Sequence, residues 1–215
     1  QGLSALAEAM EKRSSALCSL TLSAKGIETA IAGWRLFGER ALLRAHSLQH
    51  LSLADCQLRD QHCSALSRAL VVLPRLKHLS VRNNAIGNSG VRMLAQSLML
   101  HHVLEYLDLR GNQASFAVLY YYLSLAMAAN MSLRTLYCDP PRTTFEPAGL
   151  DEDLITRCFA RNITLNEVGG VVNVSSFLPS KMQVILDRNR ERQRELAKLL
   201  YTRRTRKGAV PSLQQ

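Results

Sequence analysis

The 215 residues are enough to bury a sizeable core. The hydrophobic fraction of 47% and the charged fraction of 20% are those of an ordinary soluble domain. The five cysteines are scattered without a CxxC pair, which argues against a disulfide framework or a zinc site and indicates a reducing compartment. No apolar run reaches the length of a membrane-spanning helix, so we expect no transmembrane segment.

The formal net charge of +10 is concentrated near the C-terminal end of the chain. Residues 180–215 contain ten basic and three acidic residues, which leaves a net charge of only +3 on the remainder. Such an excess favours contact with an acidic protein surface, a nucleic acid or an anionic membrane. We therefore assign the basic character to a C-terminal arm and not to the rest of the chain.

The first predicted element is a helix over residues 2–10, which reads as the helix of a repeat whose strand lies upstream. We therefore expect a fragment of a longer array, with an N-terminally truncated first repeat. A weak repeat follows at Leu17-x-x-Leu20-x-Leu22, with Lys25 in the place of the usual Asn. A long connection over residues 28–46 comes next, and we expect its Trp34 to fill the core of an enlarged repeat.

Three strong copies of one pattern come next in the chain. Leu48-x-x-Leu51-x-Leu53-x-x-Cys56-x-Leu58 fits LxxLxLxx(N/C)xL, and the pattern starts again at Leu76 and at Leu104, each time after 28 residues. The LxL alternation predicts a short strand with inward-facing leucines. The Asn or Cys at the ninth position turns inward, where it can bond backbone groups that the turning chain leaves unpaired. Val91, Leu94 and Leu98 have the spacing of one helix face, which predicts a helix after the strand.

Two weaker copies end the array. Leu133-x-x-Leu136-x-Cys138 starts 29 residues after the third strong copy, and Pro140 and Pro141 interrupt its second half. A last remnant over residues 162–168 matches residues 130–136. Because one repeat cannot bury its apolar side alone, we expect the copies to stack around one continuous core.

Residues 76–98 and 104–125, with their period of 28 to 29 and a full helix in each repeat, resemble the ribonuclease-inhibitor-like class of leucine-rich repeats. The class includes repeats of NOD-like receptors, tropomodulin C-terminal domains, Ran GTPase-activating proteins and repeat subunits of axonemal regulatory complexes. The resemblance implies an α/β solenoid with a parallel sheet on the concave face and helices on the convex face. It implies little about function, because members share a scaffold and not an activity.

We divide the chain into about five leucine-rich repeats over residues 1–176, a C-terminal cap and basic helix over residues 177–207, and a tail over residues 208–215. Pro179 or Ser180 can open the last helix, and Gly208 and Pro211 end it. Its apolar positions look placed to cover the open end of the core, namely Met182, Ile185 and Leu186.

The concave face is the first candidate binding surface. The third and fifth positions of each strand pattern point away from the core, and neighbouring strands lie about 4.8 Å apart, so His50, His78 and Tyr106 should form a row. Protein interfaces favour aromatic anchors of this kind. The candidate residues are His50, His78, Arg82, Tyr106, Asp108, Arg110 and Tyr137. The alternative is a solvated sheet face without a partner, and we expect no metal, because the two histidines lack a third ligand.

The basic arm is the second candidate surface. Its candidate residues are Arg188, Arg190, Arg192, Arg194, Arg203, Arg204, Arg206 and Lys207. A protein partner is favoured over nucleic acid, because Tyr201 is the only aromatic residue there that could stack on a base. The alternative is a solvated arm that only keeps the chain in solution.

The three consecutive tyrosines Tyr120–Tyr122 fall in a predicted helix. Consecutive helical positions spread around the helix axis, so at least one of these tyrosines should be exposed while another packs.

Motifs for catalysis are missing from the sequence: it has no Walker loop, GxGxxG, HExxH or GxSxG. We therefore expect no enzyme and no cofactor. The favoured interpretation is a cytoplasmic, non-catalytic scaffold or docking subunit of a larger assembly, with association with the cytoskeleton left open. One alternative is the sensor domain of a NOD-like receptor or similar switch protein. Another is a Ran-type GTPase-activating protein, whose family usually ends in an acidic segment, whereas this tail is basic.

Overall fold

The computed structural model describes residues 2–13, 17–23, 31–139, 152–169 and 178–208. Six short strands in this part of the chain pair in sequence order, all parallel, into one sheet. They are β1 (Ser19–Thr21), β2 (His50–Ser52), β3 (His78–Ser80), β4 (Tyr106–Asp108), β5 (Thr135–Tyr137) and β6 (Glu167–Gly169). The helices are α1 (Gly2–Arg13), α2 (Ile31–Leu36), the π-helix η2 (Phe37–Leu42), α3 (Asp60–Val72), α4 (Asn88–Leu98), α5 (Phe116–Ala129), α6 (Glu152–Arg161) and α7 (Leu178–Gly208).

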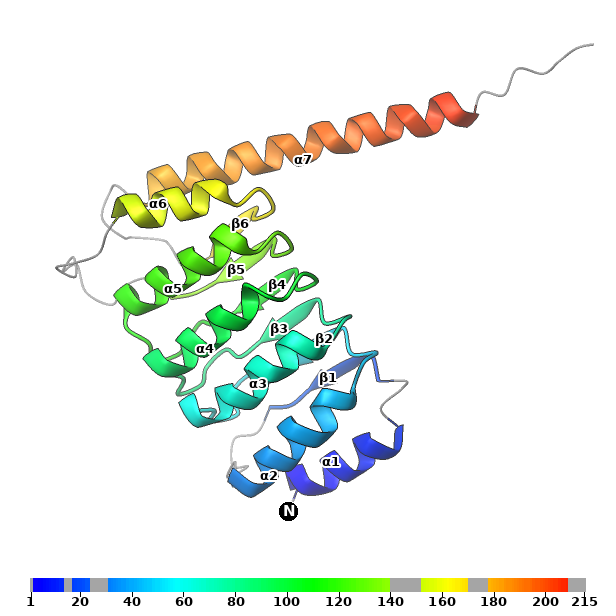
Figure 1. Ribbon diagram of the computed structural model, residues 1–215, viewed down its shortest axis with the longest axis vertical. Coiled ribbons are helices and arrows are strands. Elements are labelled where there is room, and N and C mark those ends of the chain that lie inside the picture. The colour runs from blue at the N-terminus through cyan, green and yellow to red at the C-terminus, as the bar shows by residue number, and fades with distance from the viewer. Residues whose placement is uncertain (1, 14–16, 24–30, 140–151, 170–177, 209–215) are drawn as a thin grey trace, which may run out of the picture.

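The elements form a two-layer solenoid, with the sheet on one side and the helices on the other (Figure 1). Two neighbouring parallel strands need a crossover connection, and a helix forms this connection between each pair of successive strands from β2 to β6. The predicted fold class, an α/β leucine-rich repeat solenoid with a parallel concave sheet and convex helices, is therefore confirmed. The weak copies around Leu20, Leu136 and Val168 also form strands, in register with the strong copies.

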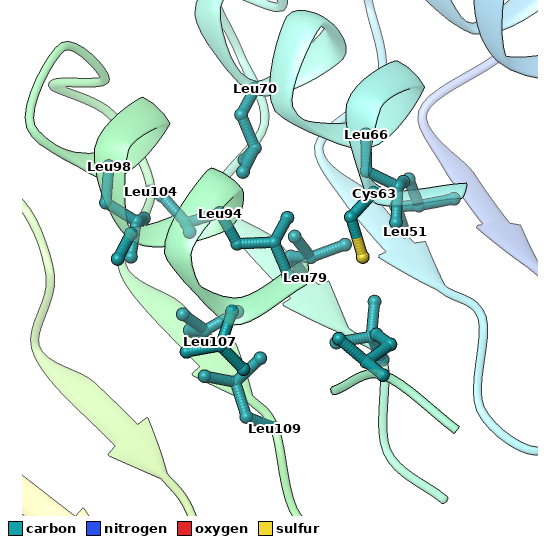
Figure 2. Packing of buried hydrophobic residues seen from close by; sticks show 14 of the residues in the cluster. Leu51, Cys63, Leu66, Leu70, Leu79, Leu94, Leu98, Leu104, Leu107 and Leu109 are labelled. Carbon is teal, nitrogen blue, oxygen red and sulfur yellow. The ribbon is translucent and has the colours of Figure 1, made fainter. Parts of the chain in front are cut away.

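The core lies between the sheet and the helices and runs through the stack without a break. The central strand residues Leu51, Leu79 and Leu107 are buried. Figure 2 shows leucines of α3 and α4, among them Leu66 and Leu94, pointing toward the strand leucines. Burying a leucine side chain stabilises the fold by about 1.5–3 kcal/mol, so each repeat depends on the neighbours that cover it.

The ninth position of the repeat ties successive turns together, as predicted. The buried Asn84 side chain accepts hydrogen bonds from the backbone N–H groups of Cys56 and Leu58, at 3.0 and 2.9 Å. It also donates to the carbonyl oxygens of Leu53 and Val81, both at 2.8 Å. One amide therefore satisfies backbone groups of two repeats that would otherwise be buried without partners.

The turn from helix to strand uses a second buried polar residue in the repeats that lead into β4, β5 and β6. Asn162 Oδ1 accepts hydrogen bonds from the N–H groups of Thr164 and Leu165, and Asn130 makes the same pair of bonds one repeat earlier. His101 replaces this asparagine in the preceding repeat, where its Nδ1 accepts from Leu104 N at 3.0 Å. The sequence match between residues 130–133 and 162–165 does not extend to residues 101–104, which read His-His-Val-Leu, so the role of His101 is not visible in the sequence.

The long connection predicted over residues 28–46 contains a helix, α2, that continues into η2. Trp34 is buried, as expected, and its Nε1–H donates to the carbonyl oxygen of His62 at 3.1 Å. Gly38 allows this segment to pack closely on α3, since a Cβ at Gly38 would lie 2.6 Å from the Cβ of Ala65. The segment thus forms the helical crossover between β1 and β2, as α3 does between β2 and β3.

Helix α7 closes the C-terminal end of the core. Met182, Ile185 and Leu186 are buried and belong to the main hydrophobic cluster, which confirms the predicted capping positions. The helix is continuous from the cap through the basic arm and ends at Gly208. The capping residues and the basic arm therefore belong to one continuous helix.

Candidate partner-binding surfaces

Four aromatic rings form one row across the open face of the sheet. Register places His50, His78 and Tyr106 side by side on β2, β3 and β4. The ring centroids of His50 and His78 are 5.4 Å apart, and His78 stacks on Tyr106 at 4.0 Å. Tyr137 of β5 extends the row by an edge contact with Tyr106 at 5.5 Å. We call these four residues the ring row.

A polar cluster anchors one end of the ring row. Arg110 binds Asp108 with two charge-assisted hydrogen bonds, from Nε at 2.9 Å and from Nη2 at 2.6 Å. The Arg110 guanidinium lies 4.4 Å from the Tyr137 ring centroid, and the Tyr137 hydroxyl donates to Glu167 on β6. This hydrogen bond raises the pKa of Tyr137 to about 12, because only the protonated phenol can donate to the carboxylate.

The remaining predicted residues of the concave face differ in exposure and charge. Asp108 is buried beneath its ion pair, so it positions Arg110 and is not itself open to a partner. Arg82 is exposed beyond the end of β3. Burial lowers the pKa of His78 and thereby favours its uncharged form. Glu167 was not predicted, although the match of residues 162–168 to an earlier strand was the available signal.

Metal binding has no support in the described residues, which contain no group of three His, Cys, Asp or Glu side chains placed to hold an ion. His50 and His78 instead contact each other and Tyr106 as rings. Among the described residues, this face presents aromatic rings together with the guanidinium groups of Arg82 and Arg110.

The basic-arm residues differ in what they contact. Arg188 donates from Nη2 to the carbonyl oxygens of Ala160 and Asn162, both at 3.0 Å, so its charge helps to fasten α7 to the last repeat. Arg190 pairs with Asp187 at 2.9 Å. Arg192 and Arg194 are exposed. The backbone of α7 includes Arg203, Arg204, Arg206 and Lys207, whose side chains lie outside the described residues.

The three consecutive tyrosines of α5 spread around the helix as expected. Tyr120 is buried, Tyr121 is exposed and Tyr122 is partly buried. Tyr120 packs inside the solenoid, and burial raises the pKa of its phenol. Tyr121 is therefore an exposed aromatic residue on the convex side, opposite the ring row.

Comparison with known proteins supports the repeat assignment directly. A family model described as Leucine Rich repeat matches residues 44–67 and 73–95, which include β2, β3 and most of their two helices. The chain therefore folds as a leucine-rich repeat solenoid of the ribonuclease-inhibitor-like kind. A comparison of this leucine-rich repeat protein with curated protein sequences gives no match.

Solved structures of the same fold cover nearly the whole leucine-rich repeat protein. The tropomodulin C-terminal domain of Caenorhabditis elegans matches with a TM-score of 0.58 and 16% identity, over 93% of this chain and 99% of that chain. A structure described as leiomodin-1 actin-binding site 2 matches with a TM-score of 0.56 and 18% identity, over 93% of this chain and 95% of that chain. Identities this low establish the shared fold alone. Within the described residues, no helix has both the length and the apolar character needed to cross a bilayer.

Proposed function

We propose that this leucine-rich repeat protein is a non-catalytic docking subunit of a larger assembly, and that a protein partner binds its concave face over the ring row. The observation that carries the proposal is the unbroken contact of four rings from His50 to Tyr137. Tyrosine supplies a large contact area with little loss of side-chain entropy, which is why such residues dominate binding hot spots.

The ring row is also held in place before any partner arrives. Stacking orders His78 and Tyr106, while Tyr137 is held between Arg110 and Glu167. Side chains that are already ordered cost less entropy to immobilise in a complex. Arg110 adds a cation whose partner Asp108 is buried, so an incoming carboxylate or carbonyl could approach the remaining donors of its guanidinium.

The basic arm provides a second contact in this proposal. Its exposed residues Arg192 and Arg194 suit an acidic protein surface. The proposal also places this protein in the cytoplasm, in association with the cytoskeleton. The leiomodin structure is named as an actin-binding site, which supports purified actin as the first defined partner to test.

A quantitative affinity purification tests the proposal. The wild-type chain, the double variant Tyr106→Ala and Tyr137→Ala, and the convex control Tyr121→Ala are used as baits against extract of the source cells. We expect proteins that are recovered equally by the wild type and the Tyr121 variant and lost with the concave variant. Equal recovery by all three baits would show that the ring row does not bind the partner.

A further inference from the structure

Helix α7 is longer than the surface that it covers. Its 31 residues correspond to about 46 Å. Asn189 donates to the carbonyl oxygens of Asn162 and Leu165, and Gln193 donates to that of Thr164. From Arg194 to Leu200 every side chain is exposed. The C-terminal half of α7 therefore projects past the last repeat (Figure 1).

The projecting half of α7 carries an apolar stripe on the same side as the buried half. Leu196 and Leu200 follow Asn189 by seven and eleven residues, which is two and three turns further along the same face. Leu199 lies beside them. The exposed fractions of Leu196, Leu199 and Leu200 are 59%, 64% and 63%. Soluble helices of this length are marginal without packing, so a half-helix with an uncovered leucine stripe is suited to being covered by a partner.

A second exposed apolar row lies on the solenoid edge beneath this projection. Ile163 and Met131 are half exposed at equivalent positions of the turns that lead into β6 and β5, and Leu100 is exposed in the turn before β4. Gln193 places α7 directly over the Ile163 turn, because it bonds both Thr164 and Asn166. Figure 1 shows the free part of α7 leaving the stack on this side, where helices end and strands begin.

These two apolar rows meet at an angle and form what we call the leucine corner: Leu196, Leu199, Leu200, Ile163 and Met131. We propose that the leucine corner binds an acidic amphipathic helix of a partner protein. The inference rests on the proposed role as a docking subunit and names the chemistry of one partner segment.

Charge determines which helix fits. Residues 194–208 contain six basic residues and a single acidic one, Glu195. Arg161 adds an exposed cation along the solenoid edge, and the exposed Arg134 adds a second one that pairs with Glu105 at 3.8 Å. A second copy of α7 in the corner would bring like charges together, whereas a helix with leucines on one side and carboxylates on the other would complement both features.

The shape of the corner favours a slim partner over a flat one. Leu196 and Leu200 face the side of α7 on which the solenoid lies, and that body extends across six strands spaced by about 4.8 Å. A bilayer surface that reached these leucines would have to occupy the space of the solenoid. A helix of about 10 Å diameter can instead lie in the angle between the two walls.

Fluorescence anisotropy with the full chain tests the proposal. The probe is a synthetic labelled helix with leucine at every third or fourth position and glutamate at most others. Its controls are a scrambled isomer of equal composition and a version with lysine in place of glutamate. We expect binding of the acidic helix at least about tenfold tighter than that of either control. Equal affinity for the acidic helix and its scrambled isomer would overturn the proposal.

Substitutions in the leucine corner test whether the acidic helix binds there. Leu196→Ser with Leu200→Ser should weaken binding of the acidic helix by about tenfold or more, as should Ile163→Ser with Met131→Ser. Val184→Ser is the matched control, because Val184 is exposed on the opposite side of α7 and should not affect binding. The melting temperature of each variant shows whether it is folded. Weaker binding of the acidic helix by Val184→Ser, or unchanged binding by Leu196→Ser with Leu200→Ser, would contradict the assignment.

Two further measurements test whether a second copy of the chain or a membrane binds the leucine corner in place of an acidic helix. Sedimentation of the chain alone should give a monomer, and vesicles of phosphatidylcholine with phosphatidylserine should not compete for the labelled helix. Leucine-dependent dimerisation or competition by vesicles would overturn the proposal in favour of a second copy or a membrane. The concave variant Tyr106→Ala with Tyr137→Ala should bind the acidic helix as the wild type does. Failure at the corner is thereby distinguished from failure of the concave surface.

Discussion

The His78 ring lies flat on the Tyr106 ring, with centroids 4.0 Å apart and planes inclined by 8°. The two residues occupy equivalent positions on adjacent parallel strands, so the contact follows from the repeat itself. A period of 28 residues brings side chains that are distant in sequence to a spacing of one strand. The concave surface therefore displays the third position of the repeats that begin at Leu48, Leu76 and Leu104, and the fifth position of the next repeat, where Tyr137 lies.

Removing Tyr106 should raise the pKa of His78. Burial is the main cause of the lowered His78 pKa, and Tyr106→Ala would expose the imidazole to water, which favours its charged form. The titration of the His78 ring protons by NMR measures the change. Tyr137→Ala serves as the control, because Tyr137 contacts Tyr106 and should leave the His78 titration unchanged. An unchanged His78 pKa in the Tyr106 variant would mean that the stack does not desolvate the imidazole.

Mild acid should destabilise the solenoid through His101. Burial lowers the pKa of this histidine in the folded chain, so the unfolded chain binds a proton more readily. The stability is complete above the unfolded pKa of about 6.5 and falls as the pH drops below it. Protonation at Nδ1 would also remove the acceptor for Leu104 N.

The variant His101→Asn isolates this effect. Asparagine forms the same turn at Asn130 and Asn162, so the variant should fold, with a smaller loss of unfolding free energy between pH 7.5 and pH 5.5. Denaturant unfolding at both pH values gives the comparison. His62 also has a lowered pKa, again mainly through burial, so part of the acid sensitivity should remain. An identical pH dependence in the variant and the wild type would rule out a contribution from His101.

Asn84→Ala should cost about 3–5 kcal/mol of unfolding free energy, because it leaves buried backbone groups of two repeats without partners. Chemical denaturation measures the loss. Gln96→Ala, on the exposed side of α4, is the control and should change stability by no more than about 0.5 kcal/mol. A loss of less than about 1 kcal/mol for Asn84→Ala would mean that water replaces the amide.

Leu186→Ala should cost about 2–4 kcal/mol, because Leu186 covers the end of the core. Val184→Ala removes an exposed side chain two residues away on the same helix and should be nearly neutral. Thermal melts of the two variants provide the comparison. Equal melting temperatures would show that α7 does not close the core.

The sequence periodicity was sufficient to predict the strands, the buried leucines, the capping residues and three of the four rings in the ring row, namely His50, His78 and Tyr106. Each of these depends on local periodicity, which a sequence displays directly. The roles of Asp108 and Arg188 could not be predicted, because they depend on long side chains that reach across turns. The leucine corner was also missed as a unit: Leu196 and Ile163 are 33 residues apart, and only the direction of α7 brings their surfaces together.

Site-directed photo-crosslinking tests the concave docking surface most directly. A photoreactive phenylalanine analogue is placed at Tyr106 in one chain and at Tyr121 in another, and both are irradiated in the source cells. Docking on the concave face predicts a discrete crosslinked protein from the Tyr106 position and none from the Tyr121 position, which lies on the convex helix α5. The same crosslinked protein in equal yield from both positions, or from Tyr121 alone, would contradict it.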